Sequence, residues 1–191
     1  MHCASDPSKA RQTEIGGTEN LLRAARADVP HVVYVSIVGV DRNPISYHRA
    51  KLAAERVIES SLVPWTILRA TQFHGFLLRG VWLIERLPVA VASKGFLFQP
   101  IDVGEVAGRL VELALAAPAG RVLDVGGPEV RTAAELVGAY FEEIGRRRVL
   151  EFPLPGKIAR AFREGAQVCP GGTYGRIRWE DFLRETVGAA V

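Results

Sequence analysis

The sequence predicts an α/β fold in which short, buried, parallel strands alternate with helices. Two segments have the apolar, β-branched composition of strands covered on both faces, at 31–38 (HVVYVSIV) and 64–70 (PWTILRA). Apolar residues recur at helical spacing before and between them, at 8–27 and 46–60. This order of strands and helices is typical of a parallel sheet with right-handed helical crossovers.

Capping residues and composition indicate the other elements. Residues 1–5 resemble the last half of a strand, and Asp6 and Pro7 are suited to begin the helix that follows. Asp102 with Glu105, and Thr132 with Glu135, have the spacing of a helix N-cap and its third residue. The other expected elements are a helix from 71 to about 87, short strands at 89–92 and 96–99, a helix ending at 117, a strand at 121–125, a helix ending near 145, a strand-like segment at 149–153, and helices near 157–164 and from 179.

The overall composition excludes several classes of protein. Of the 191 residues 48% are hydrophobic and 24% charged, which excludes a disordered chain. The net charge of +3 does not indicate a nucleic-acid-binding protein. Cys3 and Cys169 cannot form a disulfide framework, and no histidine has metal-ligand spacing, so we expect a cytoplasmic protein without a structural metal. Charged residues interrupt the apolar stretch at 73–92, and the N-terminus does not resemble a signal peptide, so we expect no membrane association.

The most specific chemical pattern is a tyrosine followed four residues later by a lysine, Tyr47 and Lys51, at the start of a helix that follows a buried strand. Residues four apart lie on one face of a helix. A nearby ammonium group and a helix N-terminus both favour the phenolate form, so Tyr47 is a candidate general acid/base. Ser36 lies near the carboxyl end of the preceding strand, where parallel sheets bind ligands, and can donate a hydrogen bond to a substrate carbonyl. The alternative is that Tyr47 is a packing residue and Lys51 a solvated one.

Several segments together resemble the short-chain dehydrogenase/reductase superfamily, and within it the atypical NmrA-like branch of NAD(P)-binding proteins. These are GTENLL (17–22), VYVSIVGVD (33–41), YHRAK (47–51), PWTILRATQF (64–73), FQPIDVGEVA (98–107) and VLDVGGPE (122–129). The resemblance implies the C-terminal part of a Rossmann-like, doubly wound parallel sheet with a small α+β subdomain on the substrate side. The sheet domain would span 1–128, including a substrate-cleft segment at 73–100, and the cap segment would span 129–191.

The resemblance also implies roles for individual residues. Tyr47 would be the acid/base, Ser36 would orient the carbonyl group, and Lys51 would lower the pKa of Tyr47 and bind the nicotinamide ribose of NADP or NAD. Further contacts to the cofactor would come from Ala4 and Ser5 at one end, and from Ala70, Thr71, Gln72 and Phe73 beside the nicotinamide. His74, Phe76 and Leu77 would lie at the substrate cleft.

The chain departs from the family pattern at two places. Glu14 stands where many members carry an asparagine, which weakens a proton relay at that position. No glycine-rich loop follows a strand and opens a helix. The chain is therefore expected to begin inside the fourth strand of the family fold and to lack on the order of 60 to 70 residues, about two βαβ-sized units. We expect impaired binding of the cofactor's pyrophosphate and an exposed edge on the strand at 31–38.

The sequence thus favours an NAD(P)-dependent oxidoreductase-like protein that reduces a small, apolar carbonyl, enone or quinone. The alternative is a non-catalytic NAD(P)-sensing regulator that acts through a protein partner; a third reading is that the chain has no independent function. The resemblance is also compatible with a homo-oligomer.

Overall fold

A parallel sheet of three strands forms the centre of the larger part of the molecule. The computed structural model describes residues 12–25, 29, 31–145 and 148–187. The strands are β1 (Val32–Ile37), β2 (Trp65–Ala70) and β5 (Gly120–Arg121), in the order β1-β2-β5. All pairs are parallel, and an isolated bridge between Ala70 and Val125 extends the pairing beyond β5. The strand expected at 121–125 is therefore mostly irregular.

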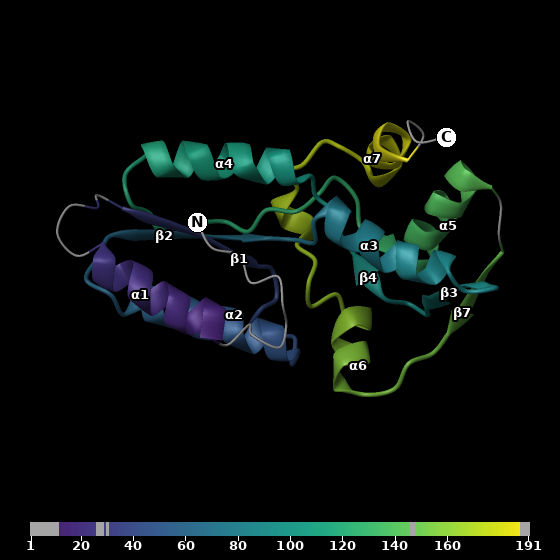
Figure 1. Ribbon diagram of the computed structural model, residues 1–191, viewed down its shortest axis with the longest axis horizontal. Coiled ribbons are helices and arrows are strands. Elements are labelled where there is room, and N and C mark those ends of the chain that lie inside the picture. The colour runs from purple at the N-terminus through teal and green to yellow at the C-terminus, as the bar shows by residue number, and fades with distance from the viewer. Residues whose placement is uncertain (1–11, 26–28, 30, 146–147, 188–191) are drawn as a thin grey trace.

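Helices cover both faces of this sheet, as expected for a doubly wound fold. A short π-helical turn, η1 (Gln12–Gly16), continues into α1 (Gly17–Ala24), which lies beside α2 (Ser46–Glu59) on one face. The other face is covered by α4 (Val103–Leu115), and Figure 1 shows the sheet between these two layers.

The alternation of side chains along β1 explains its continuous apolar character. Successive residues of a strand point to opposite faces. Val32 and Tyr34 pack with the layer formed by α1 and α2, whereas Val33 and Val35 pack against the buried cluster beneath α4. A strand buried on both faces needs apolar residues at nearly every position.

The smaller part contains α3 (His74–Glu85), α5 (Ala133–Ile144) and α7 (Trp179–Thr186) around two short ribbons (Figure 1). In one ribbon β3 (Ala90–Ser93) pairs in parallel with β7 (Val149–Phe152). In the other, β4 (Leu97–Phe98) pairs antiparallel with β6 (Arg131–Thr132). The remaining elements are α6 (Lys157–Arg163) and the 3₁₀ turn η2 (Pro170–Gly172). This is the small α+β part that the sequence predicts.

The two expected helix caps behave differently. Thr132 and Glu135 form a complete capping box at the start of α5, as predicted. Asp102 caps α4 by accepting hydrogen bonds from the backbone N–H groups of Gly104 and Glu105. The carboxylate of Glu105 does not complete a box; it accepts a hydrogen bond from the backbone N–H of Arg176 at 2.7 Å. It therefore ties α4 to the segment that leads into α7.

Three glutamines connect the sheet to the C-terminal segment. The side chain of Gln99 accepts a hydrogen bond from the N–H of Cys169 and donates one to the carbonyl of Gly127. Gln72 donates to the carbonyl of Gln167, and Gln167 donates to that of Leu97. These bonds hold the segment after α6 against the carboxyl end of the sheet.

Within the described residues β1 forms an edge of the sheet, hydrogen-bonded to β2 alone. No helix among them has both the length and the apolar composition needed to cross a membrane.

Candidate functional site

The carboxyl end of β1 and the first turn of α2 form the framework of the candidate site. After Ile37 the chain makes a short turn through Gly39, whose φ of +73° favours glycine, and α2 begins at Ser46. Ser36 is the penultimate residue of β1, and Tyr47 is the second residue of α2. The turn therefore brings the two to the same edge of the sheet, where open α/β folds bind their ligands.

Lys51 is a buried lysine, contrary to the solvated alternative. It is 7% exposed, and its ammonium Nζ lies 3.2 Å from the carbonyl oxygen of Val35, to which it donates a hydrogen bond. The same Nζ lies 4.5 Å from the centre of the Tyr34 ring, which is a cation–π contact. Both contacts hold the ammonium group of Lys51 against the middle of β1, at Tyr34 and Val35.

Glu14 supplies the counter-charge. Its carboxylate Oε2 lies 3.2 Å from the Nζ of Lys51, and Glu14 is 0% exposed. The Tyr34 hydroxyl donates a hydrogen bond of 2.8 Å to the same carboxylate. Burial and the negative charge of Glu14 raise the pKa of Tyr34 well above its usual range, so Tyr34 stays protonated as a donor. Glu14 lies in the π-helical turn η1, and such turns are frequent at functional sites.

Ser36 and Tyr47 adjoin this buried group. Ser36 lies two residues after Tyr34 and so shares its face of the sheet. It is 3% exposed, and its hydroxyl has no hydrogen-bond partner in the described part of the chain. Tyr47 is half-buried, one helical turn before Lys51, and near enough to Tyr34 to act on its pKa. The described structure thus assembles Glu14, Tyr34 and Lys51 by direct contact, with Ser36 and Tyr47 beside them.

Two further buried polar side chains near this edge also lack partners within the described residues. They are the amide of Asn43 and the Nδ1 of His48. Burial lowers the pKa of His48, which favours a neutral imidazole. Unsatisfied buried polar groups are uncommon in folded proteins, and those of Ser36, Asn43 and His48 lie within thirteen residues of one another along the chain.

A charged network lies beside the same edge, at the end of β2. The buried Arg69 makes two hydrogen bonds to the carboxylate of Glu55, at 2.6 and 2.9 Å, and one to Asp41 at 3.1 Å. Burial alone would raise the pKa of Asp41, but the hydrogen bond and the charge of Arg69 outweigh it and hold that pKa below its usual range. This network fixes α2 and the turn after β1 onto β2.

The segment that follows β2 is held rigidly. Ala70 is buried, and its carbonyl accepts a hydrogen bond from the N–H of Val38. The hydroxyl of Thr71 donates to the carbonyl of Gln99, and the amide of Gln72 bonds on both sides, to Gln99 and Gln167. Phe73 forms a bridge with Ile101. The hydrogen bonds of the Thr71 and Gln72 side chains therefore hold this segment in place.

His74 lies in the core. It is 1% exposed, and its ring stacks on Phe182 with the ring centroids 4.8 Å apart. Burial lowers its pKa to about 4, although the charge of Asp102 and the backbone carbonyl of Pro100 both act in the opposite direction. Phe76 is 68% exposed on α3, and Leu77 packs partly into the core of the smaller part. The structure therefore does not bring these three residues together around one opening.

Some predictions cannot be examined in the structure. Ala4 and Ser5 lie outside the described residues. Among the residues that are described, no group of three or more histidine, cysteine, aspartate or glutamate side chains is arranged to hold a metal ion.

Sequence reasoning missed Tyr34. The available signal was its position two residues before Ser36 in a strand, which places both side chains on one face. Glu14 was singled out only as a departure, and nothing in the sequence indicates that its carboxylate would pair with Lys51 across 37 residues.

Comparisons with known proteins identify the fold. No protein-family model matches the chain, and neither does any curated sequence. Solved structures do match. UDP-glucose 4-epimerase from Thermotoga maritima, solved with UDP-glucose, has a TM-score of 0.73 at 16% identity, over 98% of this chain and 74% of its own.

Two further solved structures agree with this comparison. A dTDP-glucose 4,6-dehydratase from Bacillus anthracis, in complex with NAD, has a TM-score of 0.68 at 15% identity, over 97% of this chain and 70% of its own. An NADPH-dependent quinone oxidoreductase from Escherichia coli, complexed with NADPH, has a TM-score of 0.72 at 14% identity, over 97% and 82%. The chain therefore has the Rossmann-type α/β fold of these enzymes.

Proposed function

We propose that the protein is an NAD(P)-dependent oxidoreductase that reduces a small carbonyl, enone or quinone at Ser36, Tyr47 and Lys51. One observation carries this proposal most directly. The buried ammonium of Lys51 bonds to the carbonyl of Val35, so a fixed positive charge adjoins the unsatisfied hydroxyl of Ser36. A donor without a partner, a cation and a phenol at the carboxyl edge of a Rossmann-type sheet suit the reduction of a polar C=O bond.

The residues present fit the nicotinamide-ribose half of the cofactor. An ammonium group has three N–H donors, and Glu14 and the carbonyl of Val35 account for two of those of Lys51. The third would bind a ribose hydroxyl, and the rigid segment from Ala70 to Phe73 would form a wall beside the nicotinamide. Similar solved structures contain NAD or NADPH, which supports this assignment.

Lys51 and the segment from Ala70 to Phe73 would hold NAD(P)H, which would supply the hydride for the carbonyl carbon. Ser36 donates a hydrogen bond from its hydroxyl to the carbonyl oxygen, which orients the substrate. Tyr47 gives its phenolic proton to that oxygen as negative charge develops there. Lys51 holds positive charge near the developing alkoxide, and Glu14 fixes the ammonium in position.

The pyrophosphate group of the cofactor needs a binding site different from that of the nicotinamide half. A glycine-rich strand–loop–helix is absent from the 191 residues. Such a loop normally binds pyrophosphate through its backbone N–H groups. We therefore propose that NADPH binds through its nicotinamide half and more weakly than in proteins that have the loop. The roles of Ala4 and Ser5 at the other end stay a proposal.

A second candidate function is a non-catalytic sensor of NAD(P). The contact between Glu14 and Lys51 favours it, because a buried carboxylate 3.2 Å from the ammonium offsets the positive charge that would act on Tyr47. Such a protein would bind cofactor and signal through a partner without turnover.

The reductase and the sensor both require NAD(P) to bind, so cofactor affinity tests both candidate functions. A Lys51→Met, Glu14→Gln double variant removes both charges together, so that neither is left buried without its partner. We expect saturable enhancement of NADPH fluorescence in the wild-type protein and at least about tenfold weaker binding in the double variant, since it lacks a charge-assisted hydrogen bond. Lys94→Met, at an exposed lysine outside the site, is the control. Equal affinities for the double variant and the control would contradict the assignment.

A further inference from the structure

One side chain contacts both members of the buried ion pair between Glu14 and Lys51. Tyr34 is the third residue of β1 and is 9% exposed. Its hydroxyl donates a hydrogen bond of 2.8 Å to the Oε2 of Glu14, and the centre of its ring lies 4.5 Å from the Nζ of Lys51. That Nζ lies 3.2 Å from the same Oε2. Tyr34 therefore binds the anion with its polar end and the cation with its ring.

These three side chains come from three different elements of the fold. Glu14 lies in η1, Tyr34 in β1 and Lys51 in α2. The backbone of η1 is tied to the following helix, because the buried Thr18 of α1 donates a hydrogen bond from its hydroxyl to the carbonyl of Glu14. The hydroxyl of Tyr34 thus connects the strand that carries Ser36 to the turn that carries the counter-charge of Lys51.

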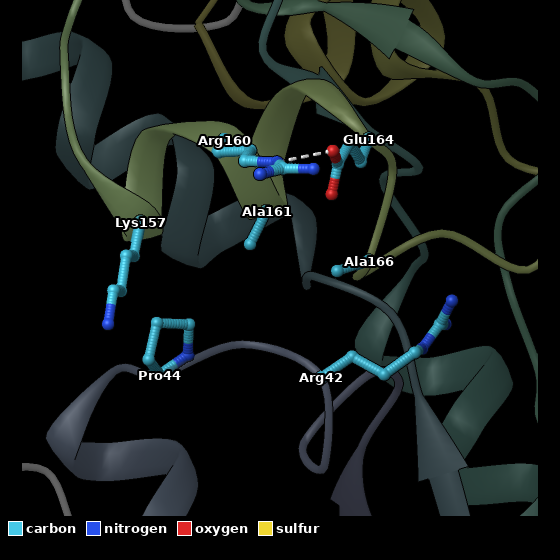
Figure 2. Close-up of a pocket in the computed structure, with 7 residues that line it drawn as sticks. All are labelled: Arg42, Pro44, Lys157, Arg160, Ala161, Glu164 and Ala166. Atoms are coloured by element: carbon cyan, nitrogen blue, oxygen red, sulfur yellow. Dashed lines mark hydrogen bonds and ion pairs between the residues drawn. The ribbon is translucent and has the colours of Figure 1, made fainter.

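The ion pair depends on the protein for its hydrogen bonds. Glu14 is 0% exposed and Lys51 is 7% exposed, so water cannot readily replace a contact that either group loses. The turn after β1 also borders a cavity in which Arg160 pairs with Glu164 (Figure 2), but neither member of the ion pair lines that cavity, and nor does Tyr34. The loss of one donor to Glu14 should therefore change the geometry of the pair itself.

We infer that Tyr34 is a positioning residue of the candidate site: its hydroxyl fixes the carboxylate of Glu14, and that carboxylate fixes the ammonium of Lys51. Without the hydroxyl, the carboxylate would have one hydrogen bond fewer and would turn, and the ammonium would move from the carbonyl of Val35 to which it now donates. The N–H that the proposed function directs at the cofactor ribose would move with it. The effect on cofactor binding rests on the proposed function, whereas the coupling of Tyr34 to the ion pair does not.

A second buried tyrosine provides a matched control. Tyr140 of α5 is 2% exposed, and its hydroxyl donates a hydrogen bond of 2.7 Å to the carboxylate of Glu85 on α3. Tyr34→Phe and Tyr140→Phe therefore each keep a buried ring and remove one hydrogen bond to a carboxylate. Only the first of these carboxylates pairs with Lys51. An effect that both variants share reflects stability, and an effect of Tyr34→Phe alone reflects the position of the ammonium.

NMR of the lysine ammonium groups tests the positioning without any cofactor. In protein labelled with ¹⁵N at lysine, the Nζ resonance of Lys51 is the one that is absent from the Lys51→Met, Glu14→Gln variant. We expect Tyr34→Phe to shift this resonance or to speed the exchange of its protons with water, because the ammonium moves. Tyr140→Phe should leave the resonance unchanged. An unchanged Lys51 resonance in Tyr34→Phe would overturn the inference.

The affinity for NADPH tests whether this position matters to the site. We expect Tyr34→Phe to bind NADPH about threefold more weakly or worse, within the range for residues that share one network, and Tyr140→Phe to bind it as the wild type does. Added to the Lys51→Met, Glu14→Gln variant, Tyr34→Phe should weaken binding no further, because the groups through which it acts are gone.

The outcomes separate this inference from the proposed function. An equal loss of affinity in both backgrounds would show that Tyr34 acts by a route other than the ion pair. An unchanged affinity despite a shifted Lys51 resonance would refute a role of Tyr34 in the site. A wild-type protein that does not bind NADPH would contradict the proposed function, while a shifted Lys51 resonance in Tyr34→Phe would still support the positioning of the ammonium by Tyr34.

Discussion

Replacing Tyr47 with phenylalanine is expected to lower the rate of NADPH-dependent carbonyl reduction by about 10²–10⁴-fold, the range that general acid catalysis contributes. The ring is kept, so packing at the start of α2 should be preserved. Only the phenolic proton is lost. The affinity for NADPH should stay unchanged, because Lys51 and the segment at 70–73 make the proposed cofactor contacts. Steady-state rates at saturating NADPH, with fluorescence titration of the cofactor, measure both quantities.

Tyr174 provides the control, since it is a half-exposed tyrosine whose backbone N–H donates to the carbonyl of Gly126, in the loop that follows β5 rather than beside β1. Tyr174→Phe should retain full activity. If Tyr47→Phe kept the wild-type rate, the role of the phenol would be refuted. If both the wild type and Tyr47→Phe bound NADPH and neither turned over any carbonyl substrate, the sensor would be the better account.

Acidification from about pH 6.5 to 4 should destabilise the protein through His74, with a contribution of about 2–3 kcal/mol. Burial lowers the pKa of this imidazole to about 4 in the folded state, below the value of about 6.5 in the unfolded chain. Between these values the unfolded state binds the proton and the folded state does not. Stability from this residue is therefore fully present above about pH 6.5 and decreases as the pH falls towards 4.

Carboxylates titrate in the same range, so the comparison must be made with His74→Phe. Phenylalanine can keep the stacking with Phe182 but cannot be protonated. The free energy of unfolding, from denaturant titrations at several pH values, should depend less steeply on pH in this variant. If the free energy of unfolding depended equally on pH in the wild type and in His74→Phe, His74 would not be buried as a neutral group. That result would restore it as a candidate substrate residue.

Local signals predict most of the fold. The apolar runs at 31–38 and 64–70 become β1 and β2, because strands buried on both faces have few polar positions. The Thr132–Glu135 pair correctly predicts the start of α5, because a capping box is a local interaction. Asp102 and Glu105 also correctly predict the N-cap and third residue of α4, but the carboxylate of Glu105 does not complete a capping box, because it accepts a hydrogen bond from Arg176, 71 residues away in the sequence.

The candidate site is less accessible to sequence reasoning. The four-residue spacing correctly places Tyr47 and Lys51 on one helix, but spacing does not indicate that Lys51 is buried. Its environment depends on Glu14 and Tyr34, which reach it only after η1 and β1 have packed together. Similarly, a histidine at the start of α3 gives no local sign that Trp179 and Phe182 of α7 will cover it.

Hydride transfer from NADPH to a carbonyl carbon tests the proposed reductase site directly. The wild-type protein should be incubated with a ketone and with NADPH carrying deuterium at one or the other face of the nicotinamide C4 position. One of the two labelled cofactors should give an alcohol heavier by one mass unit, and the other an unlabelled alcohol. A folded protein that binds NADPH but transfers deuterium from neither face would contradict a reductase site at Ser36, Tyr47 and Lys51.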